Sequence, residues 1–134
     1  MTVEYMTPPT VMTPIGPYSH IARAGTFIRI GAVAGVDPRT GELAGPDIEA
    51  QTEQIIKSFA ILLEAAGSSL DGVLHINVFL KDMRDFDRMN AAYVGAMGDR
   101  RPARTAIAVA GLPKPGALVT MDLSAVASVD GGAP

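Results

Sequence analysis

Arg104 is the residue of this sequence best suited to binding a small anion. It lies in the stretch 102–113, where every residue from Ala103 to Ala110 except Arg104 and Thr105 is apolar. The planar guanidinium can bind a carboxylate through two parallel hydrogen bonds. On residue type alone two structural roles stay open as well: a solvated arginine at a sheet end, or the partner of a distant acid.

The neighbours of Arg104 leave space for a ligand. Strand alternation puts Arg104 and Ala106 on one face and Thr105 and Ile107 on the other. A small side chain beside the arginine keeps the surface above the strand open. The sequence therefore favours a small acid as the occupant of this face.

Other residue types offer little independent chemistry. The chain has no cysteine, which excludes a disulfide, a thiolate nucleophile and a sulfur-ligated metal. Ser19 and Ser124 lie outside any nucleophile-elbow motif, and the glycines near Gly31 lack phosphate-loop spacing. We expect His20 to be a surface or interface residue and His75 to be a polar interior or interface residue.

The composition predicts one compact domain with an aliphatic core. Of the 134 residues 48% are hydrophobic and only 5% aromatic, without any tryptophan. The net charge of −3 and the scattered basic residues argue against a nucleic-acid surface. Since the sequence shows neither a signal-peptide pattern nor an 18-residue apolar run, we expect no membrane segment and a cytoplasmic protein.

The hydrophobic periodicity predicts the order β-β-α-β-α-β-β. One helix follows Asp47 and ends at Gly67, and a second follows Asp85 and ends at Gly98, with both aspartates as N-caps. Within a single domain spanning 1–134, we expect residues 1–12 to be an extended lead-in and 128–134 a disordered tail. The predicted strands lie just after residue 20 and over 27–35, 73–80, 103–110 and 117–127.

This element order favours an α+β fold with one mixed sheet and both helices on the same face. No third helix is available for the opposite face, which carries apolar as well as polar residues. Because an open, half-apolar sheet face is a liability for a monomer, we expect a homo-oligomer whose sheets pack together.

Several segments together resemble the RidA/YjgF family of small trimeric proteins, over roughly residues 13–127. Each motif is weak by itself, but they occur in the family's order and spacing, with a length difference of one or two residues only in the turn 114–117. The motifs are Ile15–Ser19 (IGPYS), Asp37–Glu42 (DPRTGE), Leu63–Gly67 (LEAAG), Val78–Asp82 (VFLKD), Asp85 with Phe86, Asn90 with Tyr93, Pro102–Thr105 (PART) and Leu112–Lys114 (LPK).

The resemblance implies a chorismate-mutase-like subunit of the bacillus type and a homotrimer whose three sheets form a barrel-like core, with a ligand cleft at each subunit interface. The best-known branch of the family hydrolyses reactive 2-imino or enamine acids to 2-oxo acids and ammonia, without a metal or cofactor. Arg104 matches the arginine that holds the substrate carboxylate. Tyr18 matches a cleft tyrosine, and Asn90 a more peripheral cleft residue.

On residue type alone, Tyr18 could instead be a turn tyrosine packed on the sheet edge, and Asn90 could cap a buried carbonyl. The resemblance implies as partners a small carboxylate-bearing substrate and further copies of the chain. From the charge and the lack of a long apolar run, we expect neither nucleic acid nor membrane as a partner.

The chain also departs from the family pattern. A Ser-Gly-Gln segment after the second strand is replaced by Gly31, Ala32 and Val33, and a cysteine by Ala106. The glutamate of the last strand aligns with Ser124, which can hold a water molecule but cannot take its proton. Asp122, about 7 Å earlier along the same face, is the candidate substitute.

Imine hydrolysis needs a carboxylate-binding group, a positioned water and a proton source, and positioning alone supplies much of the acceleration. We therefore expect Arg104, Ser124 and Asp122 to be the catalytic set. The predicted substrate contacts are Arg104, Tyr18, Gly31, Ala32, Asn90 and Ala106.

Three functions follow from the resemblance. The first is a deaminase of imine, enamine or related amino-substituted acids. The second is a small-carboxylate-binding or regulatory protein that has lost hydrolysis, which the change to Ser124 favours. The third, a ribonuclease or translation inhibitor, fits poorly with a sequence isoelectric point near 5.2.

Overall fold

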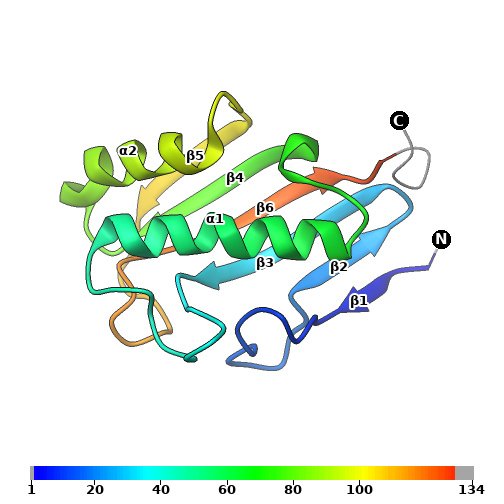
Figure 1. Cartoon of the computed structure of the whole chain (residues 1–134), viewed down its shortest axis with the longest axis horizontal. Coiled ribbons are helices and arrows are strands. Elements are labelled where there is room, and N and C mark those ends of the chain that lie inside the picture. The colour runs from blue at the N-terminus through cyan, green and yellow to red at the C-terminus, as the bar shows by residue number, and fades with distance from the viewer. Residues whose placement is uncertain (1, 129–134) are drawn as a thin grey trace.

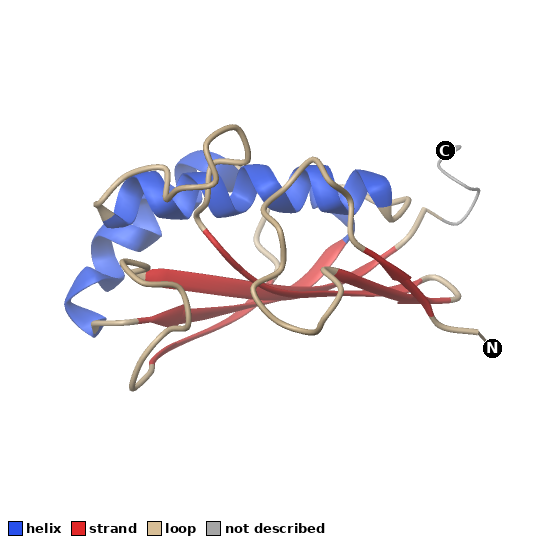
Figure 2. Ribbon diagram, turned by 90° about the horizontal axis from the view of Figure 1, so that it is seen from below, coloured by secondary structure: helices blue, strands red, loops and turns tan. Residues whose placement is uncertain are grey.

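The structure, a computed structural model, describes residues 2–128 and folds them into a sheet covered by two helices. Figure 2 shows both helices above one face of the sheet. The strands are β1 (Glu4–Met6), β2 (Ile21–Ala24), β3 (Phe27–Ala34), β4 (Val73–Leu80), β5 (Ala103–Ala108) and β6 (Val119–Val126); the helices are α1 (Ile48–Ala65) and α2 (Phe86–Met97), with short 3₁₀ turns η1 (Leu70–Gly72) and η2 (Met83–Asp85).

The strand order across the sheet is β1-β2-β3-β6-β4-β5 (Figure 1). All neighbouring pairs are antiparallel except β4 and β5, which run parallel because α2 carries the chain back between them. The predicted α+β architecture, with one mixed sheet and two helices on one face, is confirmed. In this sheet β5, the strand that holds Arg104, is an edge strand.

The first strand is the element that the sequence analysis did not assign. Residues 4–6 pair with β2, with Glu4 opposite Arg23, inside the segment expected to be an extended lead-in. Three residues are too few for a periodic pattern, so only the pairing with β2 defines the strand. Of the expected tail at 128–134, all but Ser128 lies outside the described residues.

The helix-facing side of the sheet forms the aliphatic core. From α1 the core takes Ile55, Phe59, Leu62 and Leu63, all fully buried, which matches the predicted apolar face. Burial of such side chains contributes about 1.5–3 kcal/mol each before conformational entropy is counted. The sheet contributes Ile28, Ile30, Ile76, Val78, Leu80, Val119, Met121, Leu123 and Ala125.

The predicted N-caps need a correction. Asp47 and Asp85 occupy the N-cap positions of α1 and α2, but neither side chain accepts a capping hydrogen bond. Asp85 is the last residue of η2 and already has helical backbone angles, so α2 continues from a preceding turn. The side chain that caps this region is Asp82, which accepts from the backbone N–H of Arg84 at 2.9 Å.

Among residues 2–128, neither helix is long and apolar enough to cross a membrane.

Candidate functional site

Arg104 lies on the helix-facing side of β5, beneath α2. Its Nη2 donates to the amide oxygen of Asn90 at 2.7 Å, and its Nη1 lies 3.9 Å from the sulfur of Met89. The guanidinium carbon is 4.8 Å from the ring centroid of Tyr93 and 5.8 Å from that of Phe86. The side chain is therefore held by aromatic rings and one amide, without using most of its five N–H donors.

Within residues 2–128, no carboxylate oxygen lies within 4 Å of the Arg104 guanidinium; the ion pairs found there join other residues. A cavity of about 240 Å³ adjoins it. An arginine that is partly buried, braced and without a neighbouring acid can bind a small anion. The lining comprises Asn90, Tyr93, Val94, Arg101, Pro102 and Arg104.

The residues that hold the Arg104 side chain in place lie on one face of helix α2. Phe86, Asn90 and Tyr93 are separated by four and three positions, so they share one helix face, and that face lies over the start of β5. Burial raises the pKa of the Tyr93 hydroxyl, although the positive charges of Arg104 and Arg101 act in the opposite direction. Tyr93 therefore stays neutral beside the guanidinium at physiological pH.

Tyr18 lines a second and larger cavity, of about 550 Å³. The Tyr18 side chain is 42% exposed, and its hydroxyl accepts a hydrogen bond from the backbone N–H of Ile15 at 3.3 Å. Two other predicted contacts, Gly31 and Ala32, lie in the same lining. The full lining is Met12, Ile15, Gly16, Pro17, Tyr18, Ser19, Gly31, Ala32, Ala34, Pro113, Lys114 and Thr120.

A bulge in β3 opens this second cavity. The pairing of β3 with β6 shifts between Ile30 and Val33, so Gly31 and Ala32 leave the regular ladder. On its other side, the N–H of Gly31 donates to the carbonyl of His20 at 2.9 Å, which continues the pairing of β3 with β2. The bulge thus turns the chain away from β6 beside Tyr18.

The structure separates the predicted catalytic residues within one chain. Arg104 pairs with Ile76 and so faces the helices, whereas Asp122 and Ser124 pair with Asn77 and His75 on the opposite face. Neither Asp122 nor Ser124 lines the cavity of Arg104 or that of Tyr18.

Asp122 and Ser124 belong to a polar cluster on the uncovered face. Arg29 Nη1 donates to the Ser124 hydroxyl at 2.7 Å, and Arg29 Nη2 lies 3.7 Å from Asp122. The amide of Asn77 donates to Asp122 at 2.8 Å. These contacts join β3, β6 and β4 across the face that the helices leave open.

Thr120 is the last-strand residue that lies with Tyr18, and the sequence analysis missed it. It shares the uncovered face with Asp122 and Ser124, is only 7% exposed, and pairs with Ala34 just beyond the bulge. The turn 114–117, where the family comparison needs a length change, precedes β6. Motif spacing says nothing of which β6 residue lies beside the loop of Tyr18, because that proximity comes from the pairing of β6 with β3.

Ala106 and His20 both pack against the interior of the protein. Ala106 shares the face of Arg104 and packs partly against the core. His20, expected at the surface or an interface, is buried with 1% exposure, which corrects that expectation. Its Nε2 bonds the carbonyl of Met12 at 2.5 Å, because the loop before β2 folds back over the ring.

The second histidine has a polar partner. His75 Nε2 lies 3.1 Å from the hydroxyl of Thr105, on the face away from the helices.

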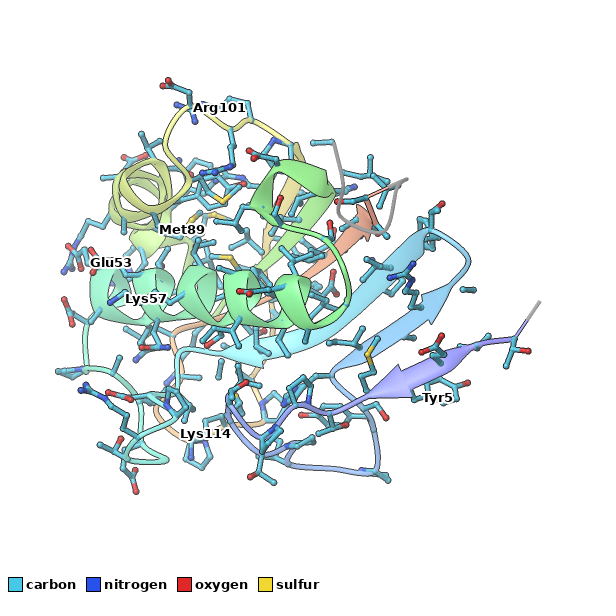
Figure 3. All side chains as sticks on the ribbon, turned by 45° about the vertical axis from the view of Figure 1, so that its right-hand side comes forward. Tyr5, Glu53, Lys57, Met89, Arg101 and Lys114 are labelled. Atoms are coloured by element: carbon cyan, nitrogen blue, oxygen red, sulfur yellow. The ribbon has the colours of Figure 1, made fainter. Side chains whose placement is uncertain are left out.

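Figure 3 shows how far apart the two cavities lie. Arg101, from the lining of the Arg104 cavity, and Lys114, from the lining of the Tyr18 cavity, lie at opposite ends of the view. In one chain, therefore, Arg104 with Asn90 forms one group and Tyr18 with Gly31, Ala32 and Thr120 forms another.

Comparison with known proteins identifies the family of this chain. The model of the family described as endoribonuclease L-PSP matches residues 9–127. A RutC family protein of Pyrococcus horikoshii is 44% identical over 85% of this chain and 88% of its own length. A mouse protein named 2-iminobutanoate/2-iminopropanoate deaminase is 35% identical over 84% of this chain and 82% of its own length.

Solved structures agree with the sequence relatives. The crystal structure of RidA from an Antarctic Psychrobacter superposes with a TM-score of 0.86 at 33% identity, covering 92% of this chain and 98% of that chain. The E. coli YjgF structure superposes with a TM-score of 0.83 at 29% identity, over 92% and 98% of the two chains. The fold is thus the chorismate-mutase-like α+β fold of these proteins, and the chain belongs to the endoribonuclease L-PSP family, which is the RidA/YjgF family that its motifs resemble.

Proposed function

We propose that this protein is a RidA-like deaminase that hydrolyses 2-imino or enamine acids to 2-oxo acids and ammonia. The observation that carries the proposal is the Arg104 guanidinium, braced by Asn90 and Tyr93 and free of any carboxylate partner within residues 2–128. The similarity to the mouse protein named 2-iminobutanoate/2-iminopropanoate deaminase supports the reaction class.

In the proposed reaction, Arg104 binds the substrate carboxylate and orients the neighbouring C=N bond. Water adds to the carbon of the protonated imine, and a proton passes from the adding water to the nitrogen. The resulting protonated carbinolamine expels ammonia while its hydroxyl group becomes the carbonyl of the 2-oxo acid, and the hydroxyl proton passes to water or to the departing ammonia. Holding water and imine in the reacting geometry supplies most of the acceleration, because a protonated imine is already electrophilic.

The proposed active site is composite. Arg104 faces the helices from the edge strand β5, where Asn90 of α2 accepts its hydrogen bond, whereas Tyr18 and Thr120 lie towards the uncovered face across the sheet. One small substrate cannot reach both groups within one chain, so a second subunit must bring the Tyr18 group to Arg104. The homotrimer with interfacial clefts, implied by the family resemblance, meets this need.

Thr120 is the proposed water-holding residue, in place of Ser124 or Asp122. Thr120 is part of the lining that contains Tyr18, whereas Ser124 and Asp122 are engaged by Arg29 and Asn77. A hydroxyl can orient water without accepting its proton. We therefore expect the pH dependence of the rate to follow the protonated fraction of the imine, and not the ionisation of a carboxylate of the enzyme.

The test is release of ammonia from 2-imino acids that an amino acid oxidase generates in the assay. We expect the wild-type protein to accelerate hydrolysis, and Arg104→Ala to lower kcat/KM about 100-fold through loss of two charge-assisted hydrogen bonds. Arg39→Ala is the matched control, since Arg39 is an exposed arginine paired with Asp37. Equal rates for wild type and Arg104→Ala would remove the arginine from the reaction.

A second candidate function is carboxylate binding without turnover. It is favoured by the absence of Asp, Glu and His side chains from the linings of both cavities. Binding of a 2-oxo acid that depends on Arg104, in a protein that releases no ammonia from any imino acid, would select this function. The net charge of −3 continues to argue against RNA as the substrate.

A further inference from the structure

In one chain, the cavity around Tyr18 is large and mostly apolar. Its volume is about 550 Å³, and hydrocarbon groups make up most of its wall, with Met12, Ile15, Pro17 and Ala34 among them. No carboxylate, amide or imidazole side chain is in the lining. Cavities that enclose whole organic ligands have volumes of about 300–1,000 Å³ and a similar apolar character.

We infer that this cavity binds the side chain of the substrate, and that the preferred substrates are 2-imino acids with a branched aliphatic or aromatic side chain. The inference rests on the proposed function and names its substrate class. The carboxylate and imine then lie towards Arg104 of the adjoining subunit, and the hydrocarbon part packs between Tyr18 and Ala34. Each methylene that leaves water contributes about fourfold in binding.

The glycine in the cavity wall supports this assignment. A Cβ built on Gly31 meets only the carbonyl oxygens of Ser19 at 3.9 Å and His20 at 4.0 Å, which are ordinary contacts. At Gly35 the same construction meets the backbone of Gln51 at 2.5 Å, so packing against α1 demands that glycine. No such demand exists at Gly31, and the neighbouring Ala32 is exposed. Small residues here keep space open rather than relieve a clash.

Lys114 favours a different ligand for this cavity, one with a second carboxylate. It is the one charged side chain in the lining of this cavity, and it could pair with a second carboxylate. A substrate with an acidic side chain would then be preferred over an aliphatic one. The surrounding hydrocarbon wall favours the aliphatic substrate, and the experiment must include both kinds.

The test compares kcat/KM for imino acids generated from leucine, phenylalanine, alanine and glutamate. We expect the leucine- and phenylalanine-derived imines to exceed the alanine-derived imine by about 10- to 100-fold, as expected for several buried methylenes. A glutamate-derived imine that matches or exceeds them would overturn the inference in favour of Lys114. Equal values for leucine and alanine would overturn it outright, while ammonia release would still support the proposed function.

A pair of variants locates the effect in this cavity. Ala32→Leu fills the wall at an exposed position, so the leucine-to-alanine ratio should fall towards one. Ala65→Leu makes the same change at an exposed position at the end of α1 and should keep the wild-type ratio. A ratio that responds to neither variant, or equally to both, would place the selectivity elsewhere and overturn the inference.

If no imine is hydrolysed, the proposed function fails and the cavity is tested by binding alone. Titration calorimetry with 4-methyl-2-oxopentanoate and pyruvate should then show binding at least tenfold tighter for the branched acid. Ala32→Leu should abolish that difference. Equal affinities for the two oxo acids would overturn the inference independently of turnover.

Discussion

The two cavities of this protein are built in different ways. Around Arg104 the wall consists of side chains that hold one another, since Asn90 bonds the guanidinium and Tyr93 stacks beside it. Around Tyr18 the space comes from the backbone, through a bulge at Gly31 and Ala32 and a loop folded over buried His20. The first cavity is suited to recognising charge, and the second to recognising shape.

Because the two cavities are built differently, they should respond to different kinds of substitution. The Arg104 cavity is sensitive to the chemistry of a single atom. A carboxylate in place of the Asn90 amide would form an ion pair with the guanidinium and compete with the substrate. A cavity formed by small residues at a bulge is sensitive to volume instead. Substitutions that keep the size but change the chemistry of a side chain should therefore impair ligand binding most in the Arg104 cavity. Substitutions that add methylene groups should impair it most in the Tyr18 cavity.

The largest effect is expected for Asn90→Asp in the Arg104 cavity. The substitution keeps the size of the side chain and puts a carboxylate where an amide oxygen lies 2.7 Å from Arg104 Nη2. Because the substrate must then displace an ion pair, KM should rise about 10- to 100-fold. Steady-state kinetics of ammonia release measure this effect.

Gln54→Glu is the matched control, since it makes the same amide-to-acid change on α1, where Gln54 bonds Ser58. Asn90→Ala should cost only a few-fold, because it removes a brace without adding a competitor. An unchanged KM in Asn90→Asp would show that Arg104 does not bind the substrate acid.

A smaller effect is expected for Thr120→Val, which replaces a hydroxyl by a methyl group at the Tyr18 cavity. Loss of the proposed water contact should lower kcat about tenfold. Thr120→Ser, which retains the hydroxyl, should recover most of the activity. Ser124→Ala should lower kcat less than Thr120→Val, since the Ser124 hydroxyl bonds Arg29 away from both cavities.

The reverse order, with Ser124→Ala the more damaging variant, would restore the assignment made from the sequence. Circular dichroism melting of the three variants provides the control for folding. Any variant that melts more than a few degrees below wild type is compared at a temperature where all three are folded.

The smallest effect concerns a charge pair away from both cavities. A side-chain hydrogen bond from Arg84, aided by its backbone N–H, lowers the pKa of Asp82 from 3.8 to about 2. A carboxyl whose pKa is lower in the folded state stabilises the fold above the unfolded pKa and loses this contribution as the pH falls through the folded one. Wild type should therefore lose a small stabilisation between pH 4 and pH 2.

Acid unfolding of Asp82→Asn checks this expectation, because the variant lacks the titrating group. Its stability curve should differ in slope from that of wild type only below about pH 4. The exposure of the pair keeps the effect small. A difference in slope near neutral pH would contradict the assignment.

Much of the fold could be predicted from local patterns. The apolar face of α1, closed by Gly67 in a left-handed conformation, follows from helical spacing and a glycine. The alternation along β4 and β6 likewise indicated which side chains would be buried, except at Leu74, which is exposed beside a register shift at the start of β4. The strand β1 could not be predicted, because its three residues are defined by pairing with β2 rather than by their own pattern.

The candidate site was predicted in part. Arg104, Asn90 and Tyr18 were identified by their motifs, and the structure joins Arg104 to Asn90. The place of Thr120 in the lining of the Tyr18 cavity was not predicted, because it depends on the pairing of β6 with β3. His20 was expected at the surface because its residue type says nothing of the loop that covers it.

The helices, five of the strands and the face of β5 that carries Arg104 could be predicted from the amino-acid order alone, since each depends on spacing within one segment. Only the tertiary structure decided that Arg104 and Asp122 lie on opposite faces of the sheet, and that Thr120 lies with Tyr18. The physical reason is that periodicity is local, whereas register and proximity arise from hydrogen bonding between strands that are distant along the chain.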